Sequence, residues 1–171
     1  MDDRIDALLS DMEAMHSAQQ RHARRGELGD EVAAHAAELT LRERLRGAIG
    51  QTVQVLIGDR EISGTAVFLG DGILVISGAE IAIIAVAHIR VIRTRSTRHR
   101  DEAGSLERLG MGSALRRLAA DHEEIAVELT GDGGVVRGRS EMIAADYVEI
   151  AGRIIPFGSI AVVRARVNPF G

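Results

Sequence analysis

The sequence contains no cysteine and no lysine, and aromatic residues make up only 2% of its 171 residues. Without cysteine the chain has no disulfide, no thiol nucleophile, no thiolate zinc site and no iron–sulfur cluster. The longest apolar run, Ile81 to Ala87, is far shorter than the roughly 20 residues that span a bilayer. The first residues, Met1-Asp2-Asp3-Arg4, form no apolar signal-peptide stretch, so we expect a cytoplasmic location.

The sequence does contain enough apolar material for a packed core. Hydrophobic residues make up 46% and charged residues 27% of the chain, which argues against general disorder. The length suits one ordinary domain or two small ones. The net charge of −4 is unevenly distributed, because up to residue 40 nine acidic residues stand against four arginines. The N-terminal part is therefore the acidic part of the chain.

Residues 1–40 are expected to form a helical N-terminal head. Ile5, Leu8, Met12 and Met15 recur at three- and four-residue steps, which is the spacing of one apolar helix face. Because this predicted helix is acidic, we do not expect it to bind anionic membranes, which favour basic helices.

From residue 41 the pattern changes to a short helix followed by five short strands. Strand-forming residues occupy 52–57, and tight turns are expected at Gly58-Asp59 and at Gly70 to Gly72. Gly64 lies inside the second predicted strand, where we expect a sharp bend. Short strands at regular spacing are typical of a small barrel, closed or partly open.

The same order of helix and strands recurs in the second part of the chain. A shift of 74 residues aligns Val53 with Val127, and a shift of 71 aligns Ile84 with Ile155 after a shorter turn near Gly152. We therefore predict a mainly β protein with N-terminal helices and two tandem small barrels, each made of a helix and five strands. The predicted domains are the head at 1–40, a first barrel with its leading helix at 41–95, a connector at 96–112 and a second barrel with its leading helix at 113–167.

A family resemblance rests on a set of strand and turn residues in both units. They are Val53 to Ile57, Gly64, Asp71 and Ile89 to Ile92 in the first unit, and Val127, Leu129, Gly138, Tyr147-Val148 and Ile160 to Val163 in the second. With these residues each unit resembles the Sm-like fold of the LSm and Hfq-type proteins, and the chain is similar to actinobacterial proteins with a helical head and paired barrels. The resemblance implies a helix before five strongly bent strands, association through the edges of strands four and five, and RNA as a ligand. An SH3-like barrel is the alternative fold.

No pattern for catalysis is found in the sequence, so we expect a protein that is not an enzyme. None of the six histidines has another histidine at the spacing of a metal clip, and no G-x-S-x-G segment occurs. Gly131 to Gly134 precedes a predicted strand rather than a helix, which indicates a hairpin turn and not a phosphate-binding loop. We expect no catalytic residue, no metal site and no cofactor.

The primary hypothesis is a protein-interaction or assembly module. The segment Ile81 to Ala87 is apolar on both faces, and such a strand at a sheet edge pairs with other strands unless it is covered. The cover is the other barrel or a neighbouring chain, and a fully buried central strand is the alternative. The expected partner is the chain itself, as a homo-oligomer or through intramolecular pairing, or another protein, with no membrane and no small-molecule substrate. The candidate assembly edge comprises Ile81, Ile83, Ile84 and Val86.

The second hypothesis is a protein that binds RNA or DNA through an arginine-rich connector. Five arginines fall within eleven residues without an acidic residue between them, and such a cluster neutralises phosphates. The net negative charge of the chain argues against nucleic-acid binding, and its four aromatic residues are few for base stacking. An exposed connector that balances the acidic head is the alternative interpretation. The candidate binding residues are Arg90, Arg93, Arg95, Arg98, Arg100 and the nearby His88.

Overall fold

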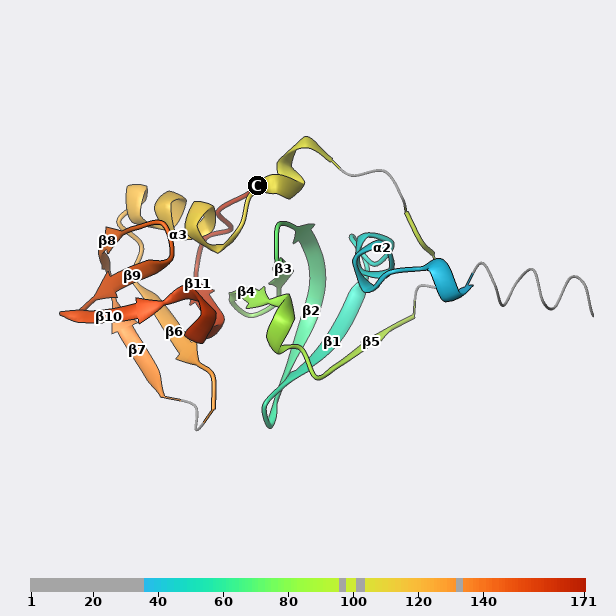
Figure 1. The fold of residues 1–171 in the computed structure, drawn as a ribbon, viewed down its shortest axis with the longest axis horizontal. Helices are drawn as coiled ribbons and strands as arrows, with labels where there is room; N and C mark the ends of the chain where they lie inside the picture. The colour runs from blue at the N-terminus through green and yellow to red at the C-terminus, as the bar shows by residue number, and fades with distance from the viewer. Residues whose placement is uncertain (1–35, 96–97, 101–103, 132–133) are drawn as a thin grey trace, which may run out of the picture. The chain divides into compact units, whose positions relative to one another are not determined.

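The computed structural model describes residues 36–95, 98–100, 104–131 and 134–171. The chain divides into two compact units, Met1–Thr40 and Leu41–Gly171. The first unit is described only from residue 36, with a helical turn at 36–38. The predicted amphipathic helix that contains Ile5 and Met15 lies outside the described residues. The second unit contains all the strands found among the described residues (Figure 1).

The first half of the unit Leu41–Gly171 has the predicted helix and five strands. The helix α2 (Leu41–Arg46) precedes β1 (Thr52–Ile57), β2 (Arg60–Leu69), β3 (Ile73–Ser77), β4 (Ile81–Ala85), the short helix η1 (Val86–His88) and β5 (Val91–Thr94). Buried and exposed residues alternate along β1, as expected for a strand with one face in a core. Gly64 in β2 is required by a close approach to β3, because a Cβ atom there would lie 2.4 Å from the Ser77 carbonyl oxygen.

The second half repeats this order with one break. The short helix η2 (Ser105–Arg108) lies in the predicted connector and is followed by α3 (Met111–Ala120), β6 (Ile125–Leu129), β7 (Val135–Gly138), β8 (Ser140–Ile143), β9 (Tyr147–Ile150), β10 (Arg153–Pro156), η3 (Phe157–Ser159) and β11 (Ile160–Ala165). The predicted second strand is divided at Gly138, whose φ of 152° is one that other residues rarely adopt. Its two parts, β7 and β8, belong to different sheets.

The strands form one sheet of eight and one sheet of three. The larger sheet has the order β5-β1-β2-β3-β4-β11-β6-β7, and the smaller has the order β10-β9-β8. The expected mainly β fold with helices is confirmed. Neither sheet closes on itself among the described strands, so the strand pairing does not confirm the two expected tandem barrels, closed or partly open. The physical reason is that β4 pairs with β11 of the other half, while the second half is split at Gly138.

The strand registers of the two halves correspond in detail. The register of β2 against β3 shifts between Ala66 and Phe68, and the register of β8 against β9 shifts between Ser140 and Met142. The two irregularities are 74 residues apart, as the sequence repeat predicts. A residue of β2 and the residue 74 positions later therefore occupy the same place in their halves.

The register corrects the sequence alignment in the first strand. Val55 of β1 lies opposite Ile62, and Val127 of β6 lies opposite Val136. Val127 therefore corresponds to Val55, 72 residues earlier, and not to Val53. The sequence shift of 74 was wrong here because the turn between β6 and β7 is two residues longer than the turn between β1 and β2.

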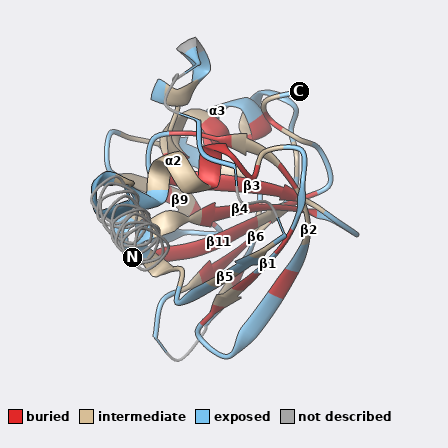
Figure 2. Ribbon diagram, turned by 90° about the vertical axis from the view of Figure 1, so that its right-hand side faces the viewer, coloured by how far each residue is buried: buried red, intermediate tan, exposed pale blue. Residues whose placement is uncertain are grey.

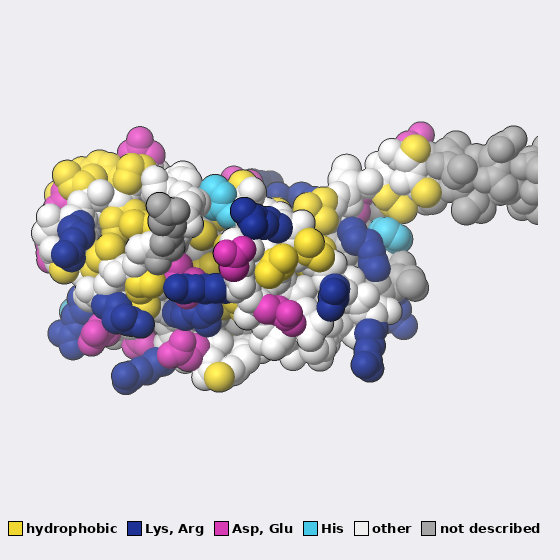
Figure 3. Space-filling model, turned by 90° about the horizontal axis from the view of Figure 1, so that it is seen from below, with side chains coloured by type: hydrophobic (Ala, Val, Ile, Leu, Met, Phe, Trp, Pro, Cys, Tyr) yellow, Lys and Arg dark blue, Asp and Glu magenta, His cyan; other side chains and the backbone are white. Residues whose placement is uncertain are grey.

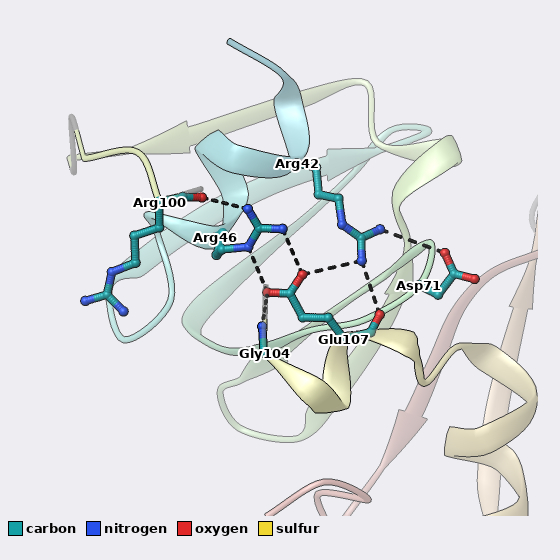
Figure 4. A network of polar contacts seen from close by, with 6 residues as sticks. All are labelled: Arg42, Arg46, Asp71, Arg100, Gly104 and Glu107. Atoms are coloured by element: carbon teal, nitrogen blue, oxygen red, sulfur yellow. Dashed lines mark hydrogen bonds and ion pairs between the residues drawn. The ribbon is translucent and has the colours of Figure 1, made fainter. Parts of the chain in front are cut away.

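A carboxylate connects the segment between the halves to the helix α2 (Figure 4). Glu107 of η2 accepts hydrogen bonds from Arg46, with Nε 2.8 Å from Oε1 and Nη2 2.9 Å from Oε2. Arg46 also donates to the Arg100 carbonyl oxygen at 2.7 Å, and Arg42 donates to the Glu107 carbonyl oxygen at 3.1 Å. The hydrogen bonds from Arg46 lower the pKa of Glu107, and the charges of Arg46 and Arg42 add to this effect against the opposing effect of burial.

Replacing Glu107 by Gln should destabilise the fold by about 2 kcal/mol at neutral pH, because charge-assisted hydrogen bonds to Arg46 are lost. The pKa of Glu107 is lower in the folded than in the unfolded chain, so its carboxylate stabilises the fold above the usual value of 4.5. This contribution is lost as the pH falls through the lower, folded pKa. The melting temperatures of wild type and Glu107→Gln should therefore converge below pH 4.5, whereas those of wild type and the exposed-site control Glu80→Gln should agree at neutral pH.

Candidate interaction surface

The pairing of β4 with β11 joins the two halves into one sheet. The strands are antiparallel, with Ile83 opposite Val163 and Ile84 opposite Val162. Figure 2 shows both strands in red, among the buried strands at the centre of the sheet. This junction lies between residues far apart in the sequence and is the contact against which the outer edges can be compared.

Side chains cross the junction in both directions. Ile73, Val75, Ile81 and Ile83 belong to the first half but pack in the apolar cluster around α3 and β6 of the second half. Val162 of the second half packs in the cluster around β1 and β2, and so does its neighbour Ala161. Successive side chains of a strand point to opposite faces, so each strand at the junction supplies both clusters. The two halves therefore share their cores.

A buried carboxylate connects charges from the two halves at the same junction. Glu128 of β6 is 8% exposed, and it accepts a hydrogen bond from Nε of Arg164 on β11. Its other oxygen lies 3.2 Å from Nη1 of Arg60, which begins β2 in the first half. A buried carboxylate is strongly unfavourable unless cations neutralise it. Arg60 and Arg164 provide that compensation.

Four of the described strands end a sheet and have an open edge: β5 and β7 in the larger sheet, and β8 and β10 in the smaller. Among the described strands, β5 pairs with β1 alone and β10 pairs with β9 alone. They lie on opposite sides of the β4–β11 junction (Figure 1). By the sequence repeat, β5 is the counterpart of β11, and β10 is the counterpart of β4. Two of the open edges, β5 and β10, thus belong to the counterparts of the strands β11 and β4, which pair with each other inside the chain.

The outer face beside β10 is an exposed copy of a face buried at the junction. Phe68, Val75 and Ile83 form a row across β2, β3 and β4, in which Val75 and Ile83 are fully buried. The corresponding row across β8, β9 and β10 is Met142, Glu149 and Ile154. Met142 is 53% exposed and Ile154 is 67% exposed. Apolar side chains also gather on the surface of the second half in the space-filling view, at the left of Figure 3.

The β5 end shows the same relation. Val162 lies opposite Glu128 in the second half, as Val91 lies opposite Leu56 in the first. Val162 is fully buried at the junction, whereas Val91 is 47% exposed. Each end of the unit therefore exposes apolar side chains whose counterparts the junction buries.

The predicted assembly edge is already paired within the chain. Ile81, Ile83 and Ile84 lie in β4, between β3 and β11, and Val86 lies after the strand in η1. Of the two covers expected for this apolar strand, the structure has the other half of the same chain. Ile81, Ile83 and Ile84 are therefore paired on both sides inside the chain, and Val86 lies outside the paired strand.

The predicted arginine cluster is divided among three places. Arg90 lies beside the turn before β2, with Nη1 3.3 Å from the Gly58 carbonyl oxygen and 3.7 Å from the Asp59 carboxylate. Arg98 and Arg100 follow the gap at 96–97, and their carbonyl oxygens accept hydrogen bonds from α2. The Arg100 side chain points away from that network (Figure 4). His88 lies elsewhere, with Nε2 3.1 Å from the Gly158 carbonyl oxygen.

Arg93 and Arg95 are brought together in a polar groove beside the open edge of β5. The groove has a volume of about 590 Å³ and is lined by Gln51, Thr52, Gln54, Arg93, Thr94 and Arg95. Arg93 lies directly opposite Gln54 on the neighbouring strand. Of the predicted arginines, these two therefore share a surface suited to an anion.

Sequence reasoning missed the residues that distinguish the junction from the open edges. Glu128 was not singled out, although a lone acidic residue in the apolar strand Ile125–Leu129 indicates a buried or paired carboxylate. Ile154 was also missed, because β10 alternates less clearly than the apolar run of β4. The alignment of Ile83 with Ile154 by the shift of 71 was the available signal.

Comparison with protein-family models, with curated proteins and with solved structures found no match. In the described part of the chain, no group of three or more side chains is arranged to hold a metal ion. A search of the same residues found no helix with the length and apolarity needed to cross a membrane.

Replacing Glu128 by Ala should cost about 3 kcal/mol of unfolding free energy, because it leaves the partly buried Arg164 without its carboxylate. Replacing Arg60 by Ala should cost at most about 1 kcal/mol, because its side chain is 55% exposed and Arg164 still neutralises Glu128. Urea unfolding of the two variants measures both values. Equal costs would contradict the assignment of Arg164 as the principal partner of Glu128.

Proposed function

We propose that this protein is a non-enzymatic assembly module that associates with itself through the open edges of β5 and β10. In this proposal its two halves are duplicated Sm-like barrels, and one junction between them is formed within the chain. The observation that carries the proposal is the match between buried residues at the β4–β11 junction and exposed residues at the two ends.

The occupant of the open face follows from the internal junction. The row of Phe68, Val75 and Ile83 is covered by the second half of the same chain. The corresponding row of Met142, Glu149 and Ile154 can therefore be covered by either half of another copy. The open β5 edge belongs to the first half. Pairing β10 of one copy with β5 of the next is the arrangement that repeats the internal contact.

The register of this contact can be transferred from the internal one. Ile83 lies opposite Val163, and these residues correspond to Ile154 and Ile92 at the shift of 71. Ile154 of one copy is then opposite Ile92 of the next. Because the two surfaces differ, each copy can bind one neighbour at each end, and the assembly is a ring or a filament.

A second candidate function is binding of RNA or DNA. It is favoured by the groove in which Arg93 and Arg95 lie together beside polar side chains. Arginines at this spacing can contact successive phosphates. The two candidates differ in their need for a second copy, because nucleic-acid binding by the groove alone would occur on the monomer.

Replacing Ile154 by Asp should raise the dissociation constant of self-association roughly tenfold or more, because a buried apolar contact is replaced by a charge. The measurement is the native mass of the full chain over a concentration series in phosphate buffer. Val167→Asp is the matched control, since Val167 is 44% exposed and lies outside the strands. A monomeric wild type at all concentrations would contradict the proposal, as would equal effects of the two substitutions.

A further inference from the structure

The contact between copies differs from the internal junction in its charges. At the internal junction Arg164 lies opposite Ala82. The corresponding residues of the β5–β10 contact, at the shift of 71, are Arg93 and Arg153. Pairing in the transferred register thus places two arginines of neighbouring copies directly opposite each other, and like charges in this position are unfavourable.

The carboxylate that neutralises arginines at the internal junction has no counterpart at the open ends. Glu128 neutralises Arg164 and Arg60 at the internal junction. The residue of β1 in the place of Glu128 is Leu56, because Leu56 lies opposite Val91 as Glu128 lies opposite Val162. The β5–β10 contact therefore has two arginines, Arg93 and Arg153, as many as the internal junction, but no carboxylate.

The arginines concerned are available to an added anion. None of the ion pairs formed among the described residues includes Arg93, Arg95 or Arg153, and all three side chains are exposed. Arg93 and Arg95 line the groove of about 590 Å³, together with the hydrogen-bonding side chains of Gln54 and Thr52. The second copy would bring Arg153 to the edge of this groove.

We infer that a phosphate-type oxyanion completes the contact between copies, bound by Arg93 and Arg95 of one copy and by Arg153 of the next. The inference rests on the proposed self-association through β5 and β10. A phosphate group fits because guanidinium groups bind it through paired hydrogen bonds and its charge of nearly −2 offsets the excess of arginine. The anion neutralises the arginines of this contact, as Glu128 neutralises those of the internal junction. The binding site is incomplete on a single copy, so the anion controls assembly.

The first test compares self-association of the full chain in chloride, in inorganic phosphate and with a short single-stranded oligonucleotide, all at one ionic strength. We expect the dissociation constant in phosphate to be roughly tenfold lower than in chloride. The matched ionic strength separates a bound anion from simple screening of the arginines. Tightening by inorganic phosphate assigns the site to a free phosphate, and tightening by the oligonucleotide alone assigns it to a nucleic-acid backbone; both support the inference.

The second test supplies the missing carboxylate from the protein. Arg153→Glu places a carboxylate opposite Arg93, so this variant should associate in chloride as tightly as wild type does in phosphate, and phosphate should have no further effect. Arg137→Glu is the matched control, because Arg137 is an exposed strand arginine away from β5 and β10, and it should behave as wild type. Self-association that is equally tight in chloride, in phosphate and with the oligonucleotide, or an Arg153→Glu variant that still requires an added anion, would overturn the inference while leaving the proposed assembly intact. Absence of self-association under every condition would contradict the assembly itself.

Discussion

The antiparallel pairing of β4 with β11 is the contact on which the rest of the structure depends. It makes one eight-stranded sheet from two halves that are separate in the sequence. It also allows Ile83 and Val162 to pack in the core of the opposite half, and it brings Arg60 to the buried Glu128. β4 and β11 are both paired by this contact, whereas their counterparts β10 and β5 each keep an open edge on opposite sides of it.

The two ends are not simple copies of the junction, and their differences would weaken the proposed contact between copies. Arg153 and Pro156 of β10 stand where β4 has Ala82 and Ala85. A charged residue and a proline on an edge strand both oppose uncontrolled pairing with other strands. Ile154 between them stays apolar and 67% exposed. Such an edge has an apolar contact residue but also residues that oppose strand pairing. It suits association that requires an additional component, such as a bound anion.

Local patterns in the sequence predicted the strands well, and the contacts between strands poorly. Alternation and glycine turns located β1 to β5, because a two-residue turn such as Gly58-Asp59 fixes where strands begin and end. The sequence could not decide what covers β4. A strand that is apolar on both faces is expected both at an edge that pairs with a partner and at the centre of a sheet. The split at Gly138 and the separation of Arg90 from Arg93 depend on tertiary structure, which spacing along the chain does not contain.

The most direct test of the account measures the register of the contact between copies. The chain has no cysteine, so Ile92→Cys and Ile154→Cys can be introduced on separate chains, mixed in phosphate buffer and treated with a short thiol-specific crosslinker. Residues directly opposite on paired strands have Cβ atoms about 5 Å apart, so we expect a crosslinked dimer of one chain of each kind. Val91→Cys mixed with Ile154→Cys should react far less, because Val91 faces the other side of β5. Equal crosslinking of both mixtures, or none in either, would contradict pairing of β5 with β10.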